Sequence, residues 1–230
     1  MTRKLALLAA VSVLGLLGVP LGAQADQISL QGSSTGGITL TGHSATMTVD
    51  VAIAAGTGCV APTQCATFQK NGVPVNDQGT YSLGAVTATA GPNMGGLFAF
   101  PAGTTESFNY TSLTDADTLS GTLTLLSIAD GSPTPRFNAV LNNITSSGDA
   151  AFTGTFPTGT SGYRVDFTTT SINGGTTTLD QLVTTNGTAT VGVSSGEVVP
   201  GPIVGAGLPG LVAACGGLLA LARRRRKQIA

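Results

Sequence analysis

The stretch TMTVDVAI, residues 46–53, carries the clearest structural signal in the chain. Every second residue in it is large and apolar, beginning with Met47, and the residues between are smaller or polar. Because successive side chains of a β-strand point to opposite faces, this period of two predicts a strand with one buried face. The same alternation returns at residues 163–168 and 189–193, so we expect strands in both halves of the chain.

The rest of the central region favours the same structure. Thr, Ser, Gly, Ala and Asn dominate it, and the residues that favour long helices are scarce. A change of apolar face within residues 119–128 predicts a β-bulge or a bend. Weaker strand candidates are residues 27–30, 80–89, 97–100, 107–111, 118–128, 137–144 and 151–156.

Turn signals lie between or beside these segments. Their residues tolerate the positive φ of tight hairpin turns, and the pairs are Asn71-Gly72, Asp130-Gly131, Asn173-Gly174 and Asn186-Gly187. We therefore predict an all-β fold, an antiparallel β-sandwich of about ten short strands. A β-solenoid is the alternative, and the absence of a fixed repeat period counts against it.

The N-terminus has the pattern of a signal peptide. Arg3 and Lys4 precede an apolar run that is too short to span a bilayer, and the small residues Ala23 and Ala25 follow it. This pattern predicts export with cleavage after Ala25, and a retained anchor is the alternative.

The C-terminus has the pattern of a membrane-spanning helix. Residues 202–222 are uncharged and long enough to cross a bilayer, and a run of cations from Arg223 to Lys227 follows them directly. The positive-inside rule places this end in the cytoplasm and the body outside. The expected organisation is a signal peptide (1–25), a β-sandwich ectodomain (26–193), a linker (194–201), a transmembrane helix (202–222) and a basic tail (223–230).

Charge separates the body from its two ends. All eleven acidic residues lie in the body against three cations, Lys70, Arg136 and Arg164, which gives the body a formal charge of −8. The other seven of the ten cations belong to the end segments. A body of this charge lacks the basic footprint of a nucleic-acid-binding protein. It remains compatible with neutral glycans or divalent cations.

Three groups of residues are candidates for chemistry. Cys59 and Cys65 are the only cysteines of the exported body, so export favours a disulfide between them, with free thiols as the alternative. His43 is the only histidine, which excludes a cluster of imidazole ligands and favours an exposed loop residue. Asp115 and Asp117 lack the rest of a calcium-binding loop, so a solvated acidic turn is expected.

Acidic and aromatic residues complete the candidates. Glu106 and Asp166 can be paired as the acid and base of a glycosidase, but their separation is not encoded in the sequence. The aromatic residues could form a platform for sugar rings, but core packing is the better interpretation for most of them. They are Phe98, Phe100, Phe108, Tyr110, Phe137, Phe152, Phe156, Tyr163 and Phe167.

The C-terminal segments together resemble the PEP-CTERM sorting signal of exported bacterial proteins. The usual Pro-Glu-Pro motif is present as a variant, Pro-Gly-Pro. The matching residues are Val199, Pro200, Gly201 and Pro202, then the apolar span, then Arg223, Arg224, Arg225 and Arg226. The resemblance implies a sorting enzyme of the exosortase type as a partner, initial anchoring in the inner membrane, and association with the cell surface and its exopolysaccharide.

The expected function is therefore that of an exported structural or adhesive protein of the cell surface or extracellular matrix. No catalytic constellation, metal site or cofactor is indicated, and no nucleic acid is expected as a partner. A glycan-binding module is the alternative, and a secreted hydrolase that uses acidic residues ranks below it.

Overall fold

The computed structural model describes residues 26–32, 37–55, 65–71, 73–92, 94–131 and 134–200. These residues form one antiparallel sheet of 12 strands and three short helices. The first six strands are β1 (Gln27–Gln31), β2 (Ile38–His43), β3 (Thr46–Ile53), β4 (Cys65–Lys70), β5 (Val73–Ala90) and β6 (Leu97–Ala99). The others are β7 (Thr105–Ser112), β8 (Thr118–Ala129), β9 (Arg136–Ser147), β10 (Tyr163–Thr169), β11 (Thr188–Val191) and β12 (Val193–Val199). The helices are α2 (Ala150–Thr155), the 3-10 helix η1 (Ile172–Gly175) and α3 (Leu179–Thr185).

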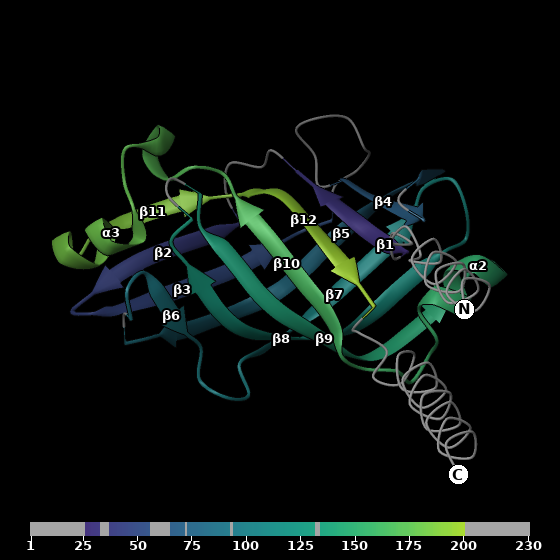
Figure 1. The fold of residues 1–230 in the computed structure, drawn as a ribbon, viewed down its shortest axis with the longest axis horizontal. Coiled ribbons are helices and arrows are strands. Elements are labelled where there is room, and N and C mark those ends of the chain that lie inside the picture. Colours follow the sequence, from purple (N-terminus) through teal and green to yellow (C-terminus); the bar gives the residue numbers. More distant parts are fainter. Residues whose placement is uncertain are drawn as a thin grey trace, which may run out of the picture.

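Eight of the strands close into a barrel (Figure 1). Going round the ring, β1 pairs with β4, then come β5, β7, β8, β9, β10 and β12, and β12 pairs back with β1. The first and last strands of the domain are thus direct neighbours, with Ile28 opposite Val198. The expected antiparallel all-β fold is confirmed, but the sheet is a single closed one and the expected separation into two sheets of a sandwich is not seen.

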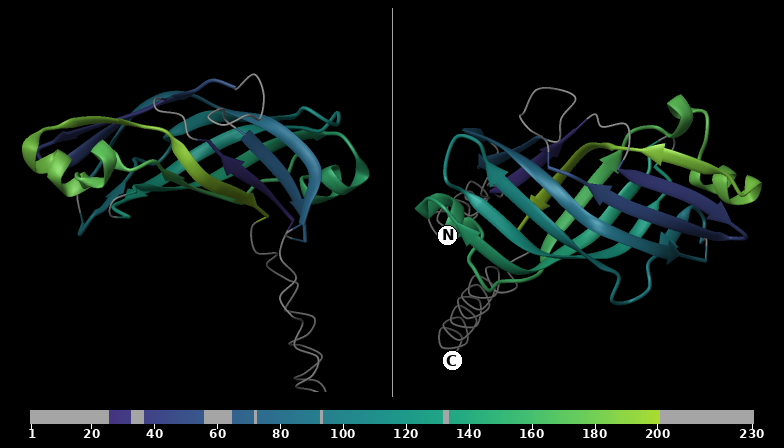
Figure 2. Two further views of the ribbon diagram at one scale, coloured as in Figure 1. Left: turned by 90° about the horizontal axis from the view of Figure 1, so that it is seen from above. Right: turned by 180° about the vertical axis from the view of Figure 1, so that it is seen from behind.

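The barrel is complete at one end and extended at the other. We name the two ends after their helices: β1 begins and β12 finishes at the α2 end, and the turn between β2 and β3 lies at the α3 end (Figures 1 and 2). Toward the α3 end, β5 runs on beyond β4 and β7. There β3 pairs with the edge of β5 that β4 occupies at the other end, and β2 and β11 are added to β3. The β5–β7 ladder runs only from Gly79 to Leu83, so the wall of the ring divides at Gly84.

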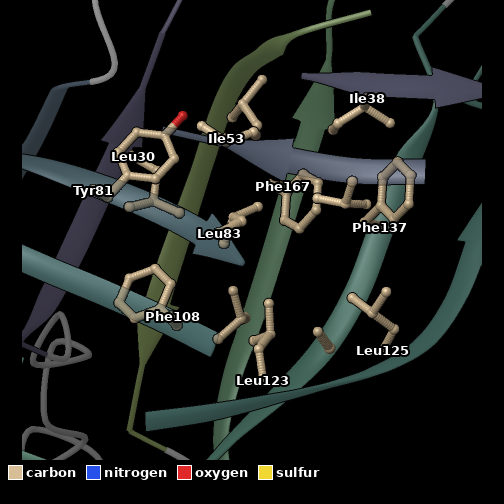
Figure 3. Close-up of a cluster of buried hydrophobic side chains, with 14 of the residues drawn as sticks. Leu30, Ile38, Ile53, Tyr81, Leu83, Phe108, Leu123, Leu125, Phe137 and Phe167 are labelled. Carbon is tan, nitrogen blue, oxygen red and sulfur yellow. The ribbon is translucent and has the colours of Figure 1, made fainter. Parts of the chain in front are cut away.

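Side chains fill the interior of the barrel. The inward positions of every strand carry buried apolar residues, as the alternation of residues 46–53 predicted. Figure 3 shows Phe137 and Phe167 among them, whose rings stack with centroids 4.7 Å apart. Ile38 of β2 belongs to the same cluster, so the added strands share one core with the ring. Burial of this apolar area is the main stabilising contribution to the fold.

A short helix covers each end of the core. At the α2 end, the buried Phe152 lies against Phe68 of β4, with ring centroids 5.2 Å apart, and against Tyr110 of β7 at 5.7 Å. At the α3 end, the backbone of α3 packs directly on β2 where Gly42 has no side chain, since a Cβ there would lie 2.2 Å from the carbonyl oxygen of Leu182. The two ends are thus covered through different contacts. An aromatic side chain is inserted at the α2 end, whereas at the α3 end the helix backbone approaches β2 closely and Leu179 and Leu182 are buried.

Several local expectations need correction. Residues 151–156 are not a strand but the helix α2, which begins because the Asp149 side chain accepts a hydrogen bond from the Phe152 N–H. Asn173-Gly174 lies within η1, and Asn186 ends α3 in the left-handed conformation, so neither pair forms a hairpin turn. The predicted bulge in residues 119–128 is confirmed by register shifts in the β8–β9 ladder.

The boundaries of the domain also change. The stretch from Ser194, predicted to be a linker, is most of β12, and it pairs on both sides with β1 and β10. The predicted signal peptide, transmembrane helix and basic tail lie outside the described residues. Within the described ranges, every helix is too short to cross a membrane.

Candidate functional site

The structure places only the first part of the predicted sorting motif. Val199 ends β12, and Pro200 follows it as the last described residue. Gly201, Pro202 and Arg223–Arg226 lie outside the described residues. Because β12 is held by ladders on both sides, the chain leaves the barrel from a fixed point at the α2 end.

The cysteine pair is likewise described in part. Cys65 is the first residue of β4, half-buried, and pairs in register with Gln31 of β1. Cys59 lies outside the described residues, so the disulfide stays a prediction.

His43 and the two aspartates of the predicted acidic turn have different surroundings. His43 is exposed at the end of β2, as expected. Asp115 is exposed as well, but Asp117 is buried, and its Oδ1 accepts a hydrogen bond of 2.7 Å from the Asp149 N–H. The interpretation as a solvated turn is therefore wrong for Asp117, whose carboxylate ties the start of β8 to the start of α2. Among the described residues, no three His, Cys, Asp or Glu side chains gather as a metal site.

The aromatic residues pack in the core. All nine that were named as candidates for a sugar platform are buried, with exposed fractions of 8% or less. Ring contacts join seven of them into two groups, one around Phe152 at the α2 end and one around Phe137 and Phe167. Core packing is thus confirmed as their role, and sugar rings have no access to their faces.

A depression with charged and polar side chains lies on the outer wall of β9, β10 and β12. It has a volume of about 370 Å³. Gly196 of β12 borders it, and the inward face of this glycine lies against the core, since a Cβ there would be 2.6 Å from the Cβ of Phe167. The residues around it are Arg136, Phe137, Asn138, Arg164, Asp166, Phe167, Thr168, Ser195, Gly196 and Glu197. We call this depression the charged groove.

The charged groove concentrates ionisable side chains in a body that has few of them. Two of the three body cations, Arg136 and Arg164, line it together with two carboxylates. Arg164 forms an ion pair with Asp166 through Nε. Asp166 stands directly opposite Glu197 in the β10–β12 ladder, an arrangement of like charges that destabilises a sheet unless cations offset it. Donors and acceptors thus lie side by side, as in sites that bind polar uncharged molecules.

Glu106 and Asp166 do not form a catalytic pair. Glu106 faces the interior from β7, next to Phe108 in the alternation of that strand, whereas the side chain of Asp166 lines the outer groove. The wall of the barrel therefore separates the two carboxyl groups, and the glycosidase arrangement of these two residues is not formed.

Glu106 is the most unusual group in the interior. Its exposed fraction is 6%, and neither carboxyl oxygen has a hydrogen-bond partner among the described residues. It lies two residues beyond Phe108, the last residue of β7 that pairs with β5, where the wall divides. Burial in this apolar setting raises the pKa of Glu106 to about 8. The carboxyl group is therefore mainly protonated at neutral pH.

Tyr81 is a second buried polar residue without a partner. Its side chain is fully buried on β5, and its hydroxyl group makes no hydrogen bond within the described part of the chain. Burial, followed by the charge of Cys65, raises the pKa of Tyr81 above its ordinary value. Tyr81 remains a neutral phenol at physiological pH.

Sequence reasoning missed the charged groove and the burial of Glu106. The groove joins residues from three strands that are not consecutive in the chain, and pairs such as Asp166 and Glu197 carry no local signal. Glu106, by contrast, is detectable, because the period of two in ESFNYTS places it on the same face as Phe108 and Tyr110. Comparison of the chain with protein-family models, curated proteins and solved structures found no match.

Proposed function

We propose that the chain is an exported structural or adhesive protein of the cell surface or extracellular matrix, held at first in the inner membrane by its C-terminal segment. The observation that supports this proposal is the pairing of β1 with β12. Both end segments join the barrel through neighbouring strands at the same end. A barrel retained by a C-terminal span needs the end of β12 on the side of the membrane, and β1 places the start of the mature chain at the same end.

The packing of the barrel supports a structural rather than a catalytic role. Its interior is occupied by the side chains of one apolar cluster, and its acidic candidates, Glu106 and Asp166, are held apart. Its outer wall is rich in Thr, Ser and Asn side chains, several of which hydrogen-bond across strands, such as Asn138 to Ser127 at 3.0 Å. A rigid body with a polar outer wall suits contact with hydrated polymers.

Processing of the C-terminus by an exosortase-type enzyme is part of the proposal. The test is the intact mass of the mature protein, isolated with a tag inserted in an exposed turn, from a host with the sorting enzyme and from the same host without it. We expect a mass that begins at Asp26 in both hosts. In the host with the enzyme, the mass should end near Pro200, and in the host without it the mass should include Arg223 to Ala230.

Matched variants show whether the sorting enzyme recognises the Pro-Gly-Pro motif. The double variant Pro200→Ala with Pro202→Ala should keep its C-terminus in both hosts, whereas Pro101→Ala, at an exposed position in the barrel, should be processed as the parent chain is. A C-terminus retained by the parent chain in both hosts would contradict sorting and leave a plain membrane anchor. A mature protein that begins at Met1 would contradict cleavage of the signal peptide.

Glycan binding at the charged groove is the second candidate function. The observation that favours it is the juxtaposition of Asn138, Arg164, Asp166 and Glu197 around the charged groove. Amide, guanidinium and carboxylate groups bind sugar hydroxyls through paired hydrogen bonds. Binding of the host's own exopolysaccharide should fall several-fold in Asn138→Ala. It should be unchanged in Asn109→Ala, an exposed residue on β7 at the far side of the ring. Equal binding by both variants would exclude the groove.

A further inference from the structure

We propose that the α2 end of the barrel rests directly on the membrane surface, with Val73 and Leu113 in contact with lipid headgroups and the barrel axis upright. This inference rests on the proposed function, because it requires residues 202–222 to span the membrane. It goes beyond that proposal by assigning a face of the barrel, an orientation and a lipid-contacting pair.

The first argument is the length of chain between barrel and span. β12 ends at Val199, and the apolar stretch begins at Pro202, three residues further on. A fully extended chain covers at most about 3.5 Å per residue, so the two points are within about 11 Å of each other. The interfacial layer on each side of the hydrocarbon core is about 5–8 Å thick. The end of β12 is therefore held at or just above the headgroup layer.

The second argument is the position of two exposed apolar side chains. Val73 begins β5 and is 64% exposed, and Leu113 follows β7 and is 53% exposed. Both belong to the α2 end, where the Leu113 N–H donates to the carbonyl oxygen of Gln78. Neither side chain contributes to the core. Apolar side chains of this kind gain free energy when they enter the interface of a bilayer.

The third argument is the place of these residues on the ring. β7 lies four strands from β12 in either direction, so it is on the opposite side of the barrel from the point where the chain leaves. Val73, at the start of β5, is three strands from β12. An anchor at β12 and apolar side chains on this other part of the ring can touch the same plane only when the barrel stands upright. A tilted barrel would lift Val73 and Leu113 away from the membrane.

Three described acidic side chains of the same end, those of Asp26, Asp117 and Asp149, are occupied by internal hydrogen bonds, whereas Asp115 is exposed. Asp26 accepts from the Asn71 N–H at 2.8 Å and from the Thr155 hydroxyl at 2.9 Å. Asp117 accepts from the Asp149 N–H, and Asp149 accepts in turn from the Phe152 N–H. Lys70 lies on the same end, at the turn between β4 and β5. These bonds lower the cost of bringing a barrel of net negative charge close to phospholipid headgroups.

Single tryptophan probes test the proposal, because the chain contains no tryptophan of its own. The chain from Asp26 to Ala230 is reconstituted in phosphatidylcholine vesicles that contain lipids brominated at the first positions of the acyl chains, which quench tryptophan at the interface. The probes are Val73→Trp and Leu113→Trp. The matched control is Met94→Trp, which replaces a 76% exposed residue near the α3 end. All three sites are on the surface, and the thermal unfolding of each variant verifies its fold.

The expected result is that the Val73→Trp and Leu113→Trp variants are quenched at least three-fold more strongly than Met94→Trp. Equal quenching of the three variants, or stronger quenching of the Met94→Trp control, would overturn the upright orientation. Flotation of the vesicles is measured in the same samples. A chain that floats with the vesicles but shows no quenching of either probe refutes the lipid contact alone. A chain that does not float refutes the membrane anchor, and the lipid contact with it.

Discussion

The two ends of the barrel solve the same packing problem in different ways. At the α2 end, each of the eight ring strands has a neighbour on both sides, and α2 inserts the side chain of Phe152 among the rings of Phe68 and Tyr110. At the α3 end, the wall divides at Gly84, extra strands extend it, and α3 lies on β2 by backbone contact. The closed α2 end is thus filled by a bulky side chain. The α3 end is instead extended by added strands and covered by a helix whose backbone lies close to Gly42 of β2.

The largest expected effect on stability comes from Glu106, which lies on β7 where the pairing with β5 ends. The pKa of Glu106 is raised from 4.5 to about 8, so the unfolded chain loses a proton between these pH values while the folded barrel keeps it. The contribution of Glu106 to the free energy of unfolding should therefore be constant below pH 4.5 and fall as the pH rises to 8. The fall is on the order of 5 kcal/mol in total, at about 1.4 kcal/mol per pH unit. Urea unfolding at a series of pH values measures it.

Two variants isolate the contribution of Glu106. Glu106→Gln and Glu106→Leu both remove the titrating group, so each should lose this decline, and Leu should also remove the cost of an unsatisfied polar group. A parent chain whose stability follows the same pH curve as the Gln variant would show that the carboxyl group is not buried in the fold.

The closed end should depend strongly on its central aromatic residue. Phe152→Ala removes a buried ring in contact with three others, and we expect a loss of about 4 kcal/mol in the free energy of unfolding. Leu182→Ala in α3 is the counterpart at the other end, and a smaller loss of about 3 kcal/mol is expected there. Chemical denaturation of both variants makes the comparison. A larger loss for Leu182→Ala would reverse the ranking of the two ends.

Replacement of one glycine by alanine at each end should change stability in opposite directions. In Gly42→Ala, the new Cβ would meet the backbone of Leu182, so α3 must move and about 2 kcal/mol of stability should be lost. Gly154 lies in α2 with open space at its Cβ, so Gly154→Ala should stabilise by about 0.5–1 kcal/mol through higher helix propensity. Thermal unfolding detects both changes, and a stabilising Gly42→Ala would refute the close contact of α3 with β2.

A small effect on stability is also expected at the start of α3. Thr178 accepts a hydrogen bond from the Gln181 N–H, and the Gln181 side chain accepts from the Thr178 N–H, which together form a capping box. Thr178→Ala should cost about 1 kcal/mol, and Thr178→Ser, which keeps the acceptor, should cost little. Chemical denaturation of the two variants compares them. Equal losses would show that the methyl group rather than the cap is responsible.

Local patterns in the sequence predicted strands, but not the way in which they pair. The alternation in residues 46–53 depends only on which face is buried, so it is visible without knowledge of neighbours. Closure of the ring depends on β1 meeting β12, and nothing near Ile28 indicates that Val198 lies opposite it. The predicted sandwich and the observed barrel share most of their strands, and they differ in such long-range pairs.

Each of the two segments that were assigned wrongly has its own physical reason. Ser194, Ser195 and Gly196 have no apolar alternation, because the outer face of β12 borders the charged groove and the polar surface. Residues 151–156 contain two Phe residues that favour a strand by propensity, and the N-cap at Asp149 outweighs that preference. Tertiary contacts decide the structure of β12, whereas the start of α2 is decided by the local Asp149 cap, which is a signal present in the sequence.

The ladders on both sides of β12 also determine how the protein bears mechanical load. If the chain is anchored through the end of β12, drag from flowing liquid on the cell surface pulls along the axis of this strand. The hydrogen bonds to β1 and β10 run across that axis, so they are sheared together and do not open one after another as in a zipper. Detachment under tension then requires the simultaneous rupture of both ladders, so the strand that joins the tether should be one of the last to give way.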